Sequence, residues 1–157
     1  FNDVEISVDE RNCLKIFAPK LNPAIWQTNA IVELMHFMNS VRKPSVYAQC
    51  DKKQFKFLGR FDNVINSGGV KIFAEELENL VKKHIDRDLV FLGKPDETLG
   101  EKLILVIEGK NEEHLKSKIY NLEFPSKFHI PKEILFLEKF PRAENGKVLR
   151  KEILKLI

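Results

Sequence analysis

A glycine turn set between two strand-like stretches constrains the fold of this chain more than any other feature. Within residues 59–72, Ser67 is followed by Gly68 and Gly69, and glycine adopts the positive φ angles that a tight reversal needs. β-branched residues flank the turn on both sides: Val64 and Ile65 before it, Val70 and Ile72 after it. This pattern predicts a β-hairpin in the middle of the chain.

The residues before this hairpin indicate further strands. Apolar and polar residues alternate over 4–17, and a polar tetrapeptide at 9–12 predicts a second hairpin, which Pro19 and Pro23 should end. Residues 31–34 form a short strand candidate. Residues 39–53 contain Pro44 and several polar residues, and we expect a surface loop or hairpin there.

The residues after the hairpin mix helices and strands. Leucines and isoleucines recur at helical spacing over 74–85, so an amphipathic helix is expected there. Apolar runs at 88–92 and 102–107 predict two paired strands joined by a loop over 94–100.

The last third of the chain continues the same pattern. Asn111 is a plausible N-cap for a helix that runs to Asn121, and residues 134–137 predict a third strand. A closing helix from about Val148 should bury Leu149, Ile153 and Leu154. The order of elements predicts an α+β fold, in which helices pack on a hairpin and a roughly three-stranded sheet.

Composition excludes several classes of function. The 157 residues are 43% hydrophobic, enough for one domain, or for a small domain with part of another. The net charge of +3 comes from 26 basic and 23 acidic residues scattered along the chain, which argues against nucleic-acid binding. No apolar run approaches the roughly 18 residues that span a membrane. The start at Phe1 suggests that the chain begins inside a longer protein.

Isolated cysteines and histidines give no sign of a reactive site. Cys13 and Cys50 lack a CxxC partner or metal-ligand spacing, so reduced structural cysteines and a cytoplasmic location are expected, with no metal site. His84 and His129 are interpreted as structural residues.

Two short motifs stand in the chain in a fixed order. The first is Gly59-Arg60-Phe61-Asp62, and the second, within residues 140–150, is a proline followed by Gly-Lys-x-x-Arg. They resemble the Gly-Arg-x-Asp motif and the closing motif of the adenylate-forming (AMP-binding) acyl-CoA synthetase superfamily. The resemblance implies that residues 1–61 form the β-rich C-terminal end of a large adenylation domain. It also implies that residues 62–157 form the mobile C-terminal lid.

The resemblance assigns roles to six residues. It implies that Lys147 is the catalytic lysine, which bridges the carboxylate and the α-phosphate oxygen during adenylation. Arg60 would bind the ribose hydroxyls, and Asp62 would be the hinge. Gly68, Gly69 and Lys71 would face coenzyme A. The alternatives are an exposed lysine at a helix N-terminus, a surface ion pair between Arg60 and Asp62, and a plain hairpin turn.

Two positions depart from the family pattern. Ala30 stands where the family has an aspartate that binds the ribose hydroxyls, and an alanine cannot accept those hydrogen bonds. Losing this charged acceptor would cost roughly 1.5–3 kcal/mol of nucleotide binding. Ala143 replaces the usual threonine of the closing motif.

The function implied is that of an ATP-dependent acid-CoA ligase, which uses ATP, Mg²⁺ and coenzyme A. The pattern over residues 62–72 and 28–34 is most similar to the o-succinylbenzoate-CoA ligases of menaquinone biosynthesis. The phosphate loop and the carboxylate pocket lie in the family's large N-terminal domain, so the fragment alone should be inactive. Another acyl-CoA ligase and a non-enzymatic lid-like interaction module remain open, as does self-association.

Overall fold

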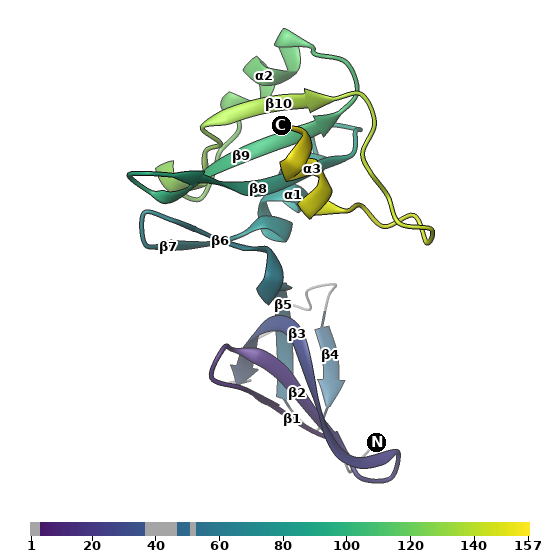
Figure 1. The fold of residues 1–157 in the computed structure, drawn as a ribbon. Coiled ribbons are helices and arrows are strands. Elements are labelled where there is room, and N and C mark those ends of the chain that lie inside the picture. The colour runs from purple at the N-terminus through teal and green to yellow at the C-terminus, as the bar shows by residue number, and fades with distance from the viewer. Residues whose placement is uncertain (1–3, 37–46, 51–52) are drawn as a thin grey trace. The chain divides into compact units, whose positions relative to one another are not determined.

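The computed structural model describes residues 4–36, 47–50 and 53–157, which form two compact units (Figure 1). The first unit comprises Phe1–Asp62 and the second Asn63–Ile157. The boundary predicted from the sequence lies one residue earlier, between residues 61 and 62.

The first unit is an antiparallel sheet with the strand order β1-β2-β3-β5-β4. Its strands are β1 (Glu5–Val8), β2 (Cys13–Ala18), β3 (Asn22–His36), β4 (Tyr47–Cys50) and β5 (Lys53–Arg60). A short 3-10 helix, η1 (Phe61–Asn63), follows β5. Ile6, Leu14 and Val32 are buried together on one side of this sheet.

The β1–β2 hairpin confirms the prediction for residues 4–17, but β3 corrects the strand expected at 31–34. That strand is the end of a much longer one, which already includes Pro23. Proline lacks an N–H to donate, but it is tolerated near the start of a strand, so it did not end the sheet here. The loop or hairpin expected at 39–53 lies largely outside the described residues. Its described part includes β4, which pairs with β5.

The second unit is built around three strands, and helices cover both of its faces (Figure 1). β9 (Gly100–Glu108) pairs in parallel with β10 (Glu133–Leu137) and antiparallel with β8 (Leu89–Asp96). The hairpin of β6 (Val64–Ser67) and β7 (Val70–Phe73) joins β9 at the Ser67–Gly100 pair. The paired strands and the central hairpin confirm the sequence predictions.

Burial on both faces explains the continuous apolar runs of β8 and β9. Alternate residues such as Phe91 and Leu105 pack with α1 (Ala74–Lys82) and α2 (Glu113–Tyr120). The residues between them, such as Val90 and Ile104, pack with Phe140 and with Ile153 of α3 (Arg150–Leu156).

Three local predictions in this unit were wrong. Residues 94–96 continue β8 instead of forming a loop. Among the described strands β8 pairs only with β9, and proline is tolerated in such an edge strand because its missing N–H can lie on the unpaired side. The N-cap of α2 is Glu112, not Asn111. Leu149 is the N-cap of α3 and is exposed, whereas Ile153 is fully buried as expected.

Candidate functional site

Lys147 lies on a tight loop between β10 and α3. An antiparallel bridge joins Arg142 to Val148 and closes the loop. Inside it, the Ala143 N–H donates to the Lys147 carbonyl and the Gly146 N–H donates to the Ala143 carbonyl, each at 2.8 Å. Gly146 has φ +80°, a conformation that glycine adopts without strain. The loop backbone is therefore well defined.

Arg142 anchors the start of this loop to the sheet. Its Nη2 donates to Asp88 Oδ2 at 2.7 Å and to Glu108 Oε2 at 2.5 Å. Glu108 also accepts from the backbone N–H of Phe140, whose ring is buried. The hydrogen bonds to Asp88 and Glu108 raise the pKa of the Arg142 guanidinium. A charged group therefore fixes the loop next to β8 and β9.

Arg150 anchors the other end of the loop. It donates two hydrogen bonds to the buried Glu78 of α1 and one to the carbonyl of Phe91, while the Phe91 N–H donates to Glu78. Glu78 was not among the residues predicted from the sequence. A signal was present, because Glu78 shares a helix face with the buried Ala74, Leu77 and Val81.

The Lys147 side chain is exposed, and its ammonium makes no hydrogen bond or ion pair with the described residues. A fixed backbone with a free cationic tip can reach an anion outside the unit. The geometry also fits the alternative of an exposed lysine before a helix.

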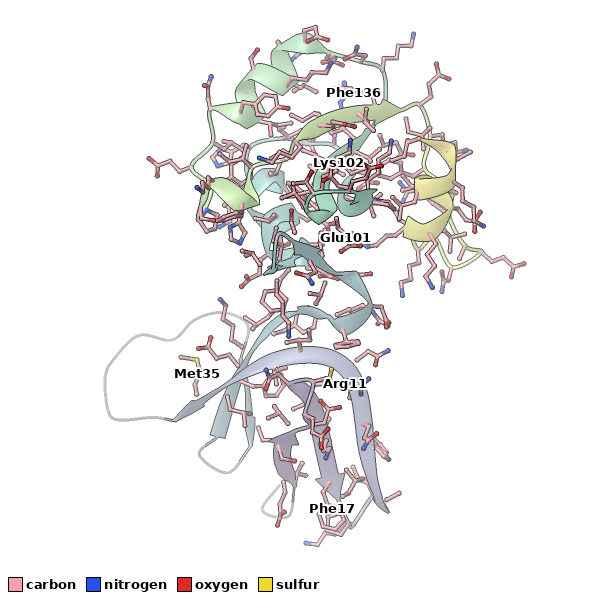
Figure 2. All side chains as sticks on the ribbon, turned by 60° about the vertical axis from the view of Figure 1, so that its left-hand side comes forward. Arg11, Phe17, Met35, Glu101, Lys102 and Phe136 are labelled. Atoms are coloured by element: carbon pink, nitrogen blue, oxygen red, sulfur yellow. The ribbon has the colours of Figure 1, made fainter. Side chains whose placement is uncertain are left out.

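The glycine turn has the predicted geometry. Gly68 and Gly69 have φ values of +59° and +81°, as in a type I′ turn. The Gly68 N–H donates to the Leu99 carbonyl at 2.9 Å, and Glu101, labelled in Figure 2, accepts from the Asn66 N–H at 2.8 Å. Lys71 is exposed on β7. These contacts hold the turn against the β8–β9 hairpin.

The turn at 68–69 and the loop at 143–147 lie at opposite edges of the second unit (Figure 1). The structure therefore does not bring Lys147 together with Gly68, Gly69 and Lys71. Arg60 and Asp62 belong to the first unit.

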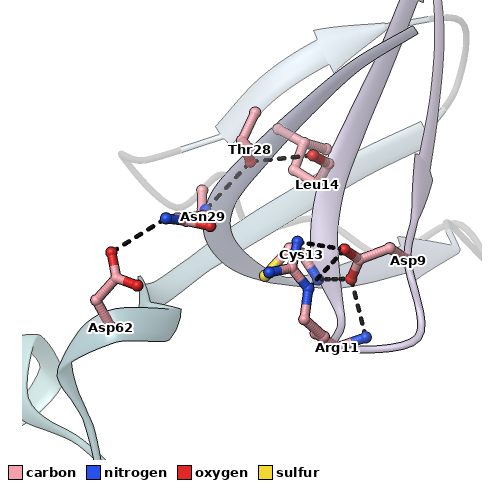
Figure 3. Close-up of polar contacts among 8 residues, drawn as sticks. Asp9, Arg11, Cys13, Leu14, Thr28, Asn29 and Asp62 are labelled. Carbon is pink, nitrogen blue, oxygen red and sulfur yellow. Dashed lines mark hydrogen bonds and ion pairs between the residues drawn. The ribbon is translucent and has the colours of Figure 1, made fainter.

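Arg60 and Asp62 form an exposed ion pair in which Arg60 Nη2 lies 3.4 Å from Asp62 Oδ2. Asn29 Nδ2 donates to the same oxygen at 3.1 Å (Figure 3). The β3–β5 register pairs Ala30 with Arg60, so an acidic residue at position 30 would lie beside the arginine. The surface ion pair weighed from the sequence is thus present, and Arg60 remains a candidate for nucleotide binding.

The two histidines interpreted as structural residues lie at the surface or next to a serine. His84 is exposed, and His129 Nδ1 lies 2.8 Å from Ser126 Oγ. Within the described ranges there is no cluster of three or more His, Cys, Asp or Glu residues that could hold a metal ion. No helix in the described part of the chain is long and apolar enough to cross a membrane.

Curated proteins and solved structures resemble this chain, although no family model matches it. A 2-succinylbenzoate–CoA ligase from Listeria monocytogenes is 26% identical over 155 residues, which cover 96% of this chain and 32% of the relative. The mitochondrial malonate–CoA ligase of Bos taurus is 31% identical over 97 residues, which cover 59% of this chain and 17% of the relative. The crystal structure of an AMP-forming acyl-CoA synthetase-like protein from Dyadobacter fermentans is 31% identical with a TM-score of 0.56, and the match covers 98% of this chain and 41% of that one.

The chain is homologous to the C-terminal part of AMP-forming acyl-CoA ligases. This confirms the family resemblance and the α+β fold. The chain spans about a third or less of the length of these curated ligases.

Proposed function

We propose that this chain is the C-terminal part of an ATP-dependent acid-CoA ligase and that Lys147 acts in carboxylate adenylation. In this reaction the carboxylate attacks the α-phosphorus of ATP, pyrophosphate leaves, and a thiol of coenzyme A then displaces AMP from the acyl adenylate. The observation that carries the proposal is the exposed Lys147 on a loop fixed at both ends by Arg142 and Arg150. The proposal is supported by the similarity of this chain to AMP-forming acyl-CoA ligases.

The lysine suits the adenylation step for an electrostatic reason. Negative charge builds up on the α-phosphate as the carboxylate attacks, and an ammonium donates hydrogen bonds to both reacting groups. In this proposal residues 1–61 complete the large domain and residues 62–157 form the lid. Arg60 contacts the ribose, Asp62 is the hinge, and Gly68, Gly69 and Lys71 serve the coenzyme A step. ATP and the acid would bind largely to the large domain.

We propose o-succinylbenzoate as the acid, which would place the protein in menaquinone biosynthesis. Two 2-succinylbenzoate–CoA ligases from Listeria monocytogenes match over 96% of this chain, whereas the malonate–CoA ligase matches over 59%. The free, buried thiol of Cys13 fits a reducing compartment such as the cytoplasm.

The test measures the two half-reactions of the full-length protein separately. Lys147→Ala should lower ATP–pyrophosphate exchange by roughly 10²–10³-fold, because it removes one charge-stabilising donor. Thioester formation from supplied acyl adenylate should stay near the wild-type rate. Lys151→Ala, an exposed lysine on α3, is the matched control and should leave both rates unchanged. Equal losses in the two half-reactions would refute the role of Lys147.

Two further measurements address the fragment and the substrate. The 157-residue chain alone should give no ATP–pyrophosphate exchange, and turnover would show that it holds a complete site. A panel of o-succinylbenzoate, malonate and indoleacetate with the full-length protein tests the acid. Preference for another acid would overturn the o-succinylbenzoate assignment while leaving the ligase assignment standing.

A further inference from the structure

The residues on either side of Asp62 are each held by a contact within their own unit. The two units join between Asp62 and Asn63. On one side, the Arg11 guanidinium lies over the Phe61 ring, 5.1 Å from its centroid. On the other, Asn63 Nδ2 donates to Glu75 Oε1 at 2.5 Å. The chain is therefore fixed immediately before and immediately after one residue.

The contact before Asp62 is built by the turn between β1 and β2. Asp9 Oδ2 accepts from Arg11 Nε at 3.0 Å and from Nη2 at 2.8 Å, as Figure 3 shows. Asp9 Oδ1 accepts from the backbone N–H groups of Arg11 and Cys13. Two bonds to one planar guanidinium fix its orientation. Phe61 is 42% exposed, and the oriented Arg11 cation contributes a cation–π contact to its ring.

The contact after Asp62 depends on the start of α1. Glu75 follows Ala74, which is fully buried and fixes the first turn of the helix. One Glu75 oxygen accepts from Asn63, and the other is buried without a hydrogen-bond partner among the described residues. A carboxylate near a helix N-terminus is electrostatically favoured, which offsets this unsatisfied oxygen. Asn63 is thus tied to a rigid part of the second unit.

Among the described residues, Asp62 itself is held only through exposed side-chain contacts. Its carboxylate receives an exposed hydrogen bond from Asn29 and an exposed ion pair from Arg60. Such exposed contacts contribute little, typically less than about 1 kcal/mol. We propose that Arg11 and Glu75 are positioning residues that confine rotation between the two units to the backbone of Asp62. This inference rests on the proposed function, in which the second unit rotates between the two half-reactions.

A confined pivot matters because the reacting groups lie far from it along the chain. Moving the pivot by one residue displaces it by about 3.8 Å. An error of about 1 Å in the placement of a catalytic group already costs on the order of 10²-fold in rate. Lys147 therefore needs a hinge that bends at one defined residue.

The first test uses backbone ¹⁵N relaxation of the 157-residue chain. In the wild type, Phe61 and Asn63 should have order parameters of about 0.85, with lower values at Asp62 only. Arg11→Met should lower the value at Phe61 toward about 0.6, and Glu75→Ala should do the same at Asn63. Glu75→Gln keeps the acceptor oxygen and should resemble the wild type. Glu10→Gln and Asn79→Ala are exposed controls on the same turn and helix.

Unchanged order at Phe61 in Arg11→Met and at Asn63 in Glu75→Ala would refute the proposal. Amide shifts of β2 check that the Arg11 and Glu10 variants are folded, and amide shifts of β8 check the Glu75 and Asn79 variants.

The second test measures acyl-CoA formation by the full-length protein. Arg11→Met and Phe61→Leu should each lower the overall rate by roughly two- to fivefold, the effect expected from one cation–π contact. The double variant should be no slower than either single one, Phe61→Tyr should restore the rate, and the KM for ATP should not change. Additive losses in the double variant would contradict the inference. Absence of ligase activity in the wild type would instead refute the proposed function and leave the relaxation result to decide the positioning role.

Discussion

Arg150 of α3 donates two hydrogen bonds, of 2.7 and 2.8 Å, to the two carboxylate oxygens of Glu78 of α1, 72 positions earlier in the sequence. The same two side chains bind the N–H and C=O groups of Phe91 in β8. Within the described residues β8 pairs only with β9, so these backbone groups lie on its free side. The ion pair thus covers a strand edge and also fixes the helix that follows Lys147.

Removing one partner of this pair should destabilise the second unit. Glu78→Ala or Arg150→Ala leaves a charge in a largely buried position, and a loss of about 3 kcal/mol in the free energy of unfolding is expected. Urea denaturation monitored by far-UV circular dichroism measures this loss in the free energy of unfolding.

The double variant Glu78→Leu/Arg150→Met provides the control. It should recover only part of the loss, because the buried backbone groups of Phe91 then lack partners at about 1–3 kcal/mol. Full recovery would show that covering the strand edge contributes nothing.

Gly146 sets the backbone conformation just before Lys147. Its φ of +80° is strained for residues with a Cβ, although open space surrounds it. Gly146→Ala should therefore destabilise the folded state by about 1 kcal/mol through the backbone alone. Gly146→Asn should cost less, since asparagine tolerates this region. Equal midpoints of urea unfolding for the two variants would contradict this explanation.

The Lys102–Glu133 ion pair between β9 and β10 should make stability depend on pH at both extremes. Its hydrogen bond lowers the pKa of Glu133 and raises that of Lys102. The Glu133 contribution is present above the unfolded-state pKa of about 4 and is lost as pH falls through the folded value. The Lys102 contribution is complete below its unfolded-state pKa of about 10.4 and is lost as pH rises through the folded value.

The variant Lys102→Met tests this pair, and Figure 2 labels the residue. The variant should lose both dependences, so its urea midpoint should differ most from the wild type near neutral pH and least at about pH 3 and 11. A constant difference across pH would mean that the lysine acts through packing and not through charge.

Cys13 should react slowly in the folded protein. The thiol is fully buried, and burial raises its pKa, with a further contribution from Asp9. Because the thiolate is the reactive form, a disulfide reagent should modify Cys13 at least about tenfold faster in urea than in buffer. The measurement uses Cys50→Ser, so that Cys13 is the single thiol. Rapid reaction in buffer would show that this sheet opens readily.

Local patterns predicted much of the fold because they act over a few residues. The Ser67-Gly68-Gly69 turn requires positive φ angles, and the structure has them. The helical spacing after residue 74 identified α1, although the helix ends at Lys82, three residues before the predicted end. The errors arose at Pro23 and Pro95, where proline was interpreted as a breaker. Whether a proline ends a strand depends on the partner strands, which lie elsewhere in the sequence.

The residues of the candidate site also fall into those that the sequence could predict and those that it could not. Lys147, Arg60 and Asp62 could be named from motifs, because the family resemblance identifies them without knowledge of packing. The acidic partners Glu78, Asp88 and Glu108 could not, because each lies at least 34 positions from the arginine it binds.

The sequence by itself determined the turn at residues 68–69, the helical and strand segments and the likeness to acyl-CoA ligases, since these depend on side chains close together along the chain. Only the tertiary structure decided that Arg142 and Arg150 fix the two ends of the Lys147 loop, and that Phe61 and Asn63 are held on either side of Asp62. The physical reason is that hydrogen bonds and ion pairs act over a few ångströms in space, and folding chooses which distant residues come within that range.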